Sequence, residues 1–166
     1  MHDLYSETDL QAIRGQLKKR LFVLLAVSAI FLAAVIYTLI LDNHKDHRPE
    51  ALTTAVTLLW GFTLIFGWDV FCRPLRCYAK HLNAALHGRT HTVSVEFSRA
   101  SEDTSVVDGV TYRDLVFLGD ADKHGDRDRM FYWDVQLAEP PFRTGEQVTL
   151  CYYDKFITGY SRENDL

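Results

Sequence analysis

The chain has 166 residues, of which 18 are Lys or Arg and 22 are Asp or Glu, and it carries a net charge of −4. This length would fit one soluble domain of ordinary size. The three cysteines are an odd number, which argues against a framework of disulfides and is typical of a chain in a reducing cytoplasm.

The apolar residues are concentrated in two blocks, residues 21–41 and 51–72. Neither block contains Lys, Arg, Glu or Pro, and Asp69 is the one ionisable residue in either of them. A bilayer core about 30 Å thick needs roughly 20 apolar residues in a helix, so both blocks predict transmembrane helices. The alternatives are less consistent with the pattern. A buried soluble hairpin would show a polar face, and a cleaved signal peptide would begin earlier and be shorter.

The charges around the two blocks predict the orientation of the chain. Lys and Arg are retained on the cytoplasmic side. Four lie before the first block and four directly after the second, within residues 73–89, whereas the connecting loop, residues 42–50, has only Lys45 and Arg48, balanced by three acids. We therefore expect a multi-pass protein of the cell's inner (plasma) membrane, with both termini in the cytoplasm and an external loop.

Helical patterns flank the two spans. Residues 1–20 form an amphipathic N-terminal segment in which Ser6 can cap a helix, although a frayed tail is an equal alternative. Residues 73–89 predict a helical stalk, in which Pro74 starts a new segment or kinks the old one and Gly88 ends the helix.

From residue 90 the apolar period changes to two, which is typical of β-strands. Five strands are expected, at residues 93–97, 110–118, 130–137, 147–153 and 156–160, with a turn at Asp108-Gly109. The fold class is therefore a membrane α-helical hairpin plus a small all-β domain at residues 90–166, a five-stranded barrel of OB or SH3-like type.

The FRTGEQVTLCYY segment joins a turn to an alternating strand. Together with the two spans and the five strands, it resembles small bacterial two-span proteins that carry OB-like domains, of which the NfeD type is an example. The segments GRTH, DGVTYRDL, FYWDV and FITGY look like those of uncharacterised bacterial membrane proteins. The NfeD resemblance implies assembly with partner membrane proteins rather than catalysis.

Two loops contain metal-type ligands. Asp120 and Asp122 begin a run that looks like a calcium loop, but its twelfth position is Phe131 instead of a bidentate acid. His44 and His47 lie among acids in the loop between the spans, where zinc or copper would find donors. Solvation explains the polarity of both loops, so we expect no bound metal and no cofactor.

Asp69 is the candidate functional residue within the membrane, because ionisable groups in spans are costly and often functional. It lies near the end of the second block, one turn from Arg73, so an i,i+4 ion pair is the preferred interpretation over a proton or ion site. Residues Thr53, Thr54, Thr57 and Thr63 offer contacts to another helix, or hydrogen bonds to their own.

No motif for catalysis is present, and residues 90–166 carry 8 basic against 15 acidic residues, a net charge of −7 that excludes a phosphate-binding surface. We therefore predict a non-enzymatic membrane adaptor or scaffold whose β-domain binds a protein partner. Its partners are the bilayer and a second copy or another membrane protein, not nucleic acid. The alternative is a small homo-oligomeric transporter or channel, or an accessory subunit of a transport complex. A membrane-tethered enzyme is a third hypothesis.

Overall fold

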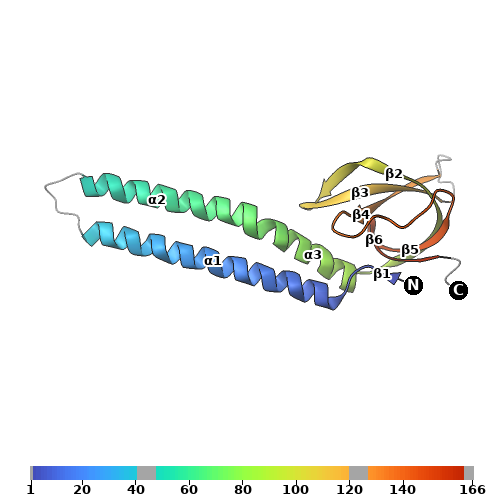
Figure 1. The fold of residues 1–166 in the computed structure, drawn as a ribbon, viewed down its shortest axis with the longest axis horizontal. Helices are drawn as coiled ribbons and strands as arrows, with labels where there is room; N and C mark the ends of the chain where they lie inside the picture. The colour runs from blue at the N-terminus through green and yellow to red at the C-terminus, as the bar shows by residue number, and fades with distance from the viewer. Residues whose placement is uncertain (1, 41–47, 120–126, 163–166) are drawn as a thin grey trace. The chain divides into compact units, whose positions relative to one another are not determined.

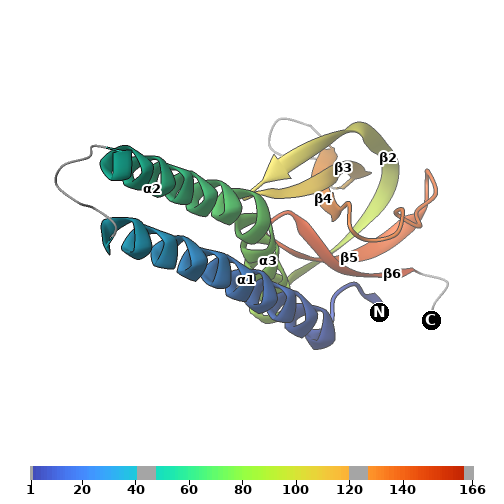
Figure 2. The ribbon, with the colours of Figure 1, turned by 60° about the vertical axis from the view of Figure 1, so that its left-hand side comes forward.

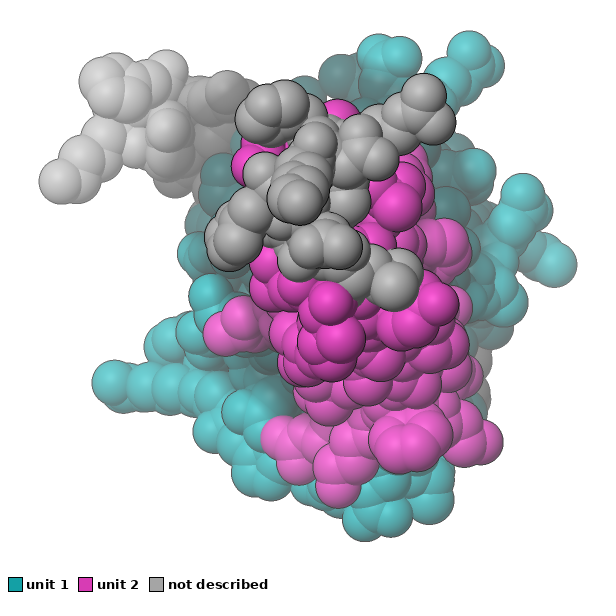
Figure 3. Space-filling view, turned by 90° about the vertical axis from the view of Figure 1, so that its left-hand side faces the viewer, with its two compact units in different colours: residues 1–12, 77–166 teal, residues 13–76 magenta. Residues whose placement is uncertain are grey.

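A computed structural model describes residues 2–40, 48–119 and 127–162. The chain divides into two compact units, which Figure 3 shows in different colours. Met1–Ala12 and Cys77–Leu166 form one, called here the β unit, and Ile13–Arg76 form the other, called the helical unit. The first twelve residues therefore belong with the β-domain, although they lie at the opposite end of the sequence.

Helix α1 spans Glu7–Ile40 without interruption, so the predicted N-terminal segment and the first span are one helix. Ser6 caps it as predicted. The backbone N–H of Asp9 donates to Ser6 Oγ at 3.3 Å, and the N–H of Ser6 donates to Asp9 Oδ2 at 3.0 Å. This reciprocal pair is a capping box with Asp in place of Glu. No proline interrupts the segment before the apolar block, which is why the helix runs on.

The second apolar block begins in α2, Arg48–Gly67, and ends in a five-residue π-helical turn, η1, Trp68–Cys72. Helix α3, Arg73–His87, follows and coincides with the predicted stalk. In η1 the N–H of Arg73 bonds to the carbonyl of Trp68, five residues earlier. Pro74 has no N–H to continue the regular α-helical ladder, which accounts for the change of winding just before it.

Helices α1 and α2 lie side by side and antiparallel (Figures 1 and 2). Two side-chain hydrogen bonds join them: Trp60 Nε1 donates to Ser28 Oγ at 3.1 Å, and Thr53 Oγ1 donates to Thr38 Oγ1 at 2.9 Å. The other three threonines bond to carbonyls of their own helix four residues earlier: Thr54, Thr57 and Thr63. Both roles predicted for these threonines therefore occur.

The outer surface of the helical unit is apolar. Phe22, Ile40 and Ile65 are more than two-thirds exposed, and most of the exposed large apolar side chains of the described residues lie in this unit. A core helix of a soluble protein would have such side chains covered. Both helices are long and apolar enough to cross a membrane.

The β unit contains a six-stranded sheet. Its strands are β1 His2–Asp3, β2 His91–Val107, β3 Val110–Leu118, β4 Asp128–Asp134, β5 Gln147–Tyr153 and β6 Phe156–Arg162. All five predicted strands are present, but β2 runs well past its predicted end, and β4 ends at Asp134 rather than at residue 137. The turn between β2 and β3 is confirmed by the positive φ angles of Asp108 (52°) and Gly109 (79°). The sixth strand, β1, was not predicted.

Long β2 pairs with two different strands. Its first residues pair with β5 and its remainder with β3, and irregularities in its register lie between Phe97 and Thr104. Further pairings join β3 to β4 and β5 to β6, all antiparallel, and a single parallel pair, Tyr132 with Phe156, joins β4 to β6. Each of these five strands thus pairs with two others, and β1 adds to β6.

Aromatic and branched side chains from all five long strands fill the core, and the members buried most completely include Leu115, Phe117 and Leu150. Helix α3 buries Tyr78, Leu82 and Ala85 on one face, and the hairpin turn at Gly109 lies against this helix. All three cysteines are free. The β unit is therefore a sheet domain that also holds most of α3 and the first residues of the chain.

Candidate functional site

Asp69 lies in the π-helical turn, and its Oδ1 accepts a hydrogen bond from Arg73 Nη1 at 2.8 Å. The predicted i,i+4 ion pair is confirmed. Both side chains are more than half exposed, at 58% for Asp69 and 65% for Arg73. The carboxylate thus has a partner on its own helix.

The most unusual polar arrangement of the described residues surrounds Asp134, at the end of β4. Only 1% of Asp134 is exposed. Its Oδ2 accepts hydrogen bonds from Tyr78 Oη at 2.8 Å and from Tyr5 Oη at 3.3 Å. Its Oδ1 accepts from the backbone N–H of Gln136 at 2.8 Å. A buried carboxylate is very costly unless it is hydrogen-bonded, so these donors are what allow it to remain in the core.

The donors come from three separate parts of the chain. Tyr5 precedes α1, Tyr78 lies on α3, and the carboxylate lies on β4. Tyr5 is 8% exposed and Leu10, one turn into α1, is 1% exposed. A buried apolar residue before the cap and another at the fourth helical position form a hydrophobic staple, which sets the direction in which the chain enters the helix. We call Tyr5, Tyr78, His81, Tyr112 and Asp134 the tyrosine–aspartate cluster.

His81 and Tyr112 complete this cluster. His81 Nε2 lies 3.3 Å from Tyr5 Oη, and the imidazole ring makes edge contacts with the rings of Tyr112 at 5.3 Å and Phe156 at 5.1 Å between centroids. The His81 ring is therefore held between α3, the N-terminal segment and the sheet, with aromatic rings on several sides.

Burial shifts the pKa of the tyrosines and the histidine of the cluster, all of which lie outside the two apolar blocks. Burial raises the pKa of the hydroxyls of Tyr5, Tyr78 and Tyr112, and the nearby Asp134 carboxylate raises it further. These groups therefore stay protonated and can act as donors. Burial also lowers the pKa of His81, and the negative charge of Asp134 offsets part of that change.

The composition of the cluster, a carboxylate with tyrosines and a histidine, would suit proton transfer in an open site. Its burial favours a structural role instead, because Asp134 and Tyr112 are each 1% exposed and offer no face to a substrate. The cluster joins the segment before α1, helix α3 and the sheet.

The predicted metal candidates His44, His47, Asp120 and Asp122 lie outside the described residues. Within the described ranges there is no group of three or more His, Cys, Asp or Glu residues arranged to hold a metal ion. Asp128, within the run that resembles a calcium loop, lies 3.8 Å from Arg99 in an ion pair.

The amino-acid sequence alone does not reveal the cluster. Its one visible signal is Asp134, an acid inside the largely apolar run MFYWDVQL, which is unusual for a strand with a buried face. Nothing in the sequence showed that Tyr5, more than 120 residues earlier, would be its partner.

No protein-family model, no curated protein and no solved structure matches this chain.

Replacing Tyr78 with Phe tests the structural role of the cluster. Tyr78→Phe removes the shorter of the two tyrosine hydrogen bonds to a buried charge, so we expect the free energy of unfolding of the full chain to fall by about 1.5–3 kcal/mol. Denaturant unfolding in detergent measures it. Tyr132→Phe is the matched control. It removes a tyrosine hydroxyl on β4, the strand of Asp134, that does not bond to Asp134, so the loss of stability should be much smaller. Equal losses in both variants would contradict the role assigned to Asp134.

His81 should make the β unit sensitive to mild acid. Its pKa is lowered in the folded chain relative to about 6.5 in an unfolded one, so the unfolded chain takes up a proton first as the pH falls. The free energy of unfolding is therefore highest above about pH 6.5 and decreases below it. We expect the thermal midpoint of the full chain to drop between about pH 7.5 and about pH 5.5, and His81→Gln to reduce that drop. His91→Gln, which replaces an exposed histidine at the start of β2, should leave the drop intact.

Proposed function

We propose that this chain is a non-enzymatic integral membrane adaptor, in which the helical unit is the anchor and the β unit binds a protein partner at the cytoplasmic surface. The proposal rests on which parts of the chain belong to the β unit. The chain leaves this unit after residue 12 and returns to it at residue 77, so both helices of the hairpin continue into one compact domain. Two chain connections therefore join the β unit to its anchor, an arrangement that suits a scaffold better than a single flexible linker.

Membrane insertion is supported by the apolar surface of the helical unit and by its internal hydrogen bonds. In a bilayer every polar group has to find a partner within the protein. The threonine side chains of α2 bond either to α1 or to their own helix, and the indole N–H of Trp60 bonds to Ser28. The charges flanking the two apolar blocks support an orientation with both termini inside.

An OB-like barrel is the proposed form of the sheet. The cycle of pairings β2–β3–β4–β6–β5–β2, with β4 and β6 parallel, supports closure. Closure would remove the free edges that a sheet of this size otherwise exposes. The NfeD-type resemblance agrees with this proposal and implies assembly with a partner membrane protein.

A partner surface is available on the β unit. Val106, Thr111 and Val135 lie next to each other on β2, on β3 and just after β4, because Val106 pairs with Thr111 and the N–H of Val135 bonds to the carbonyl of Thr111. All three are exposed, Val106 to 69% and Val135 to 46%. Together they form a row across three neighbouring segments, with an apolar side chain on either side of a threonine, which we call the valine row. Apolar residues in such a position favour contact with another protein.

Site-specific photo-crosslinking from this row tests the proposal. A photoreactive residue at Val106 or Val135 of the full chain, in native membranes, should give a crosslink to the same second protein, identified by mass spectrometry. A photoreactive residue at Thr149, exposed on β5, is the matched control and should not. The crosslinks from Val106 should disappear in a Val135→Arg background. Only homo-oligomeric crosslinks, or a diffuse set shared with Thr149, would contradict the adaptor proposal.

The Asp69→Asn substitution separates the adaptor from the transport alternative. An exposed ion pair contributes only about 0–1 kcal/mol, so we expect Asp69→Asn to leave membrane insertion and partner crosslinking unchanged. Reconstituted vesicles then measure ion or proton flux with the original and the substituted chain. A flux through the original chain that Asp69→Asn abolishes, with assembly intact, would favour the transporter instead.

A further inference from the structure

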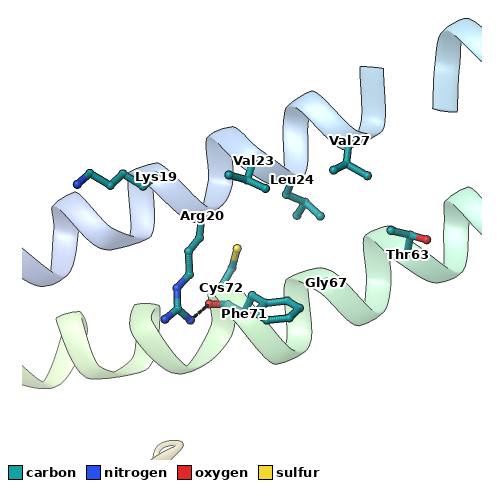
Figure 4. A pocket seen from close by; sticks show the side chains of 9 residues that line it. All are labelled: Lys19, Arg20, Val23, Leu24, Val27, Thr63, Gly67, Phe71 and Cys72. Atoms are coloured by element: carbon teal, nitrogen blue, oxygen red, sulfur yellow. Dashed lines mark hydrogen bonds between the residues drawn. The ribbon is translucent and has the colours of Figure 1, made fainter. Parts of the chain in front are cut away.

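An elongated cavity of about 530 Å³ lies within the helical unit, between α1 on one side and α2 with η1 on the other (Figure 4). Carbon-rich side chains form most of its wall. Nine residues line it: Lys19, Arg20, Val23, Leu24, Val27, Thr63, Gly67, Phe71 and Cys72. We call this cavity the inter-helix groove.

The groove changes from cationic to apolar along its length. Figure 4 shows Lys19 and Arg20 at one end and Val27 with Thr63 at the other. Val27 lies eight positions after Lys19 in α1, which corresponds to a rise of about 12 Å along the helix. That length is close to half of a hydrocarbon core about 30 Å thick. The groove therefore has the polarity and the depth of one leaflet.

The π-helical turn places a hydrogen-bond acceptor beside Arg20. Arg20 Nη1 donates to the carbonyl oxygen of Phe71 at 3.1 Å, across from α1 to η1. A guanidinium has five N–H donors in a planar fork, so this bond orients Arg20 and leaves other donors for an anion. Gly67 allows close approach at the next turn, because a Cβ there would lie 2.9 Å from Leu24 Cδ1.

The cations at the groove entrance are not neutralised from within the described residues. Neither Lys19 nor Arg20 forms an ion pair there. The one carboxylate of the apolar blocks, Asp69, is already paired with Arg73. A second copy of this chain seated in the groove would bring its own basic cluster towards these two cations, and it has no unpaired acid in its apolar blocks to offset the repulsion.

We propose that the inter-helix groove binds an anionic glycerophospholipid, with one acyl chain against Val23, Leu24 and Val27 and the phosphate near Lys19 and Arg20. The proposal rests on the membrane insertion proposed above. A basic residue at the membrane surface attracts anionic lipid with an energy that corresponds to roughly a fivefold change in affinity. The lipid would fill the space between the helices on the side where α1 and η1 are bridged by Arg20.

Native mass spectrometry of the full chain in a neutral detergent tests the proposal, with equal amounts of phosphatidylglycerol and phosphatidylcholine added. We expect one phosphatidylglycerol to be retained in preference to phosphatidylcholine. Lys19→Gln should reduce this preference about fivefold. Lys18→Gln is the matched control, because Lys18 is an equally exposed neighbour that does not line the groove, and it should leave the preference unchanged.

A second variant tests the acyl-chain part of the groove. Val27→Phe fills the apolar end and should release both lipids, while Lys19→Gln changes only the preference between them. Equal retention of the two lipids by the original chain would overturn the proposal, as would equal effects of Lys18→Gln and Lys19→Gln or a lipid-free dimer.

Alkaline extraction of membranes keeps this inference separate from the proposed function. A chain released by alkali is not integral, and membrane insertion itself would then fail. A chain that stays in the membrane but shows no lipid preference would contradict only the lipid site.

Discussion

The buried carboxylate of Asp134 is the constraint on which the arrangement of the β unit depends. A carboxylate that is 1% exposed is very costly to bury unless the fold surrounds it with donors, and two of its three donors are tyrosines from outside the sheet. Those tyrosines belong to the segment before α1 and to α3. The need to satisfy one acid therefore brings the two ends of the helical hairpin to the same strand. Strand β1, beside β6, and the buried staple of Tyr5 with Leu10 hold the N-terminal segment in the same place.

Both helices of the hairpin continue into one unit, so two chain connections join the β-domain to the hairpin. Within that unit the acid, the tyrosines and the histidine stabilise the packing of the N-terminal segment and α3 on the sheet. The low exposure of the cluster is consistent with that role. The valine row, by contrast, carries two exposed apolar side chains, which we propose meet another protein.

A different physical requirement shapes the helical unit. Proline cannot supply the N–H that a regular helix needs, and the chain responds at Pro74 with a π-helical turn over Trp68–Cys72. That turn is where Arg20 bridges to the Phe71 carbonyl and where the groove has its cationic end. The proposed lipid site thus depends on backbone geometry that follows from one proline. It also depends on basic residues that, in the sequence, indicated only the orientation of the chain in the membrane.

The sequence by itself determined the local structure. Apolar length defined the two helices, Ser6 marked the start of α1, and period-two alternation with Asp108-Gly109 located the strands, because these signals act over a few neighbouring residues. It also identified the Asp69–Arg73 pair, which spans one helical turn. Only the tertiary structure decided that Tyr5 and Tyr78 meet Asp134, that β1 joins β6, and that Lys19 lines a groove while Lys18 does not. The first two contacts join residues far apart in the chain, and the third depends on which face of a helix a residue occupies. The chemistry of a side chain does not specify a distant partner, because the fold of the whole chain decides which residues meet.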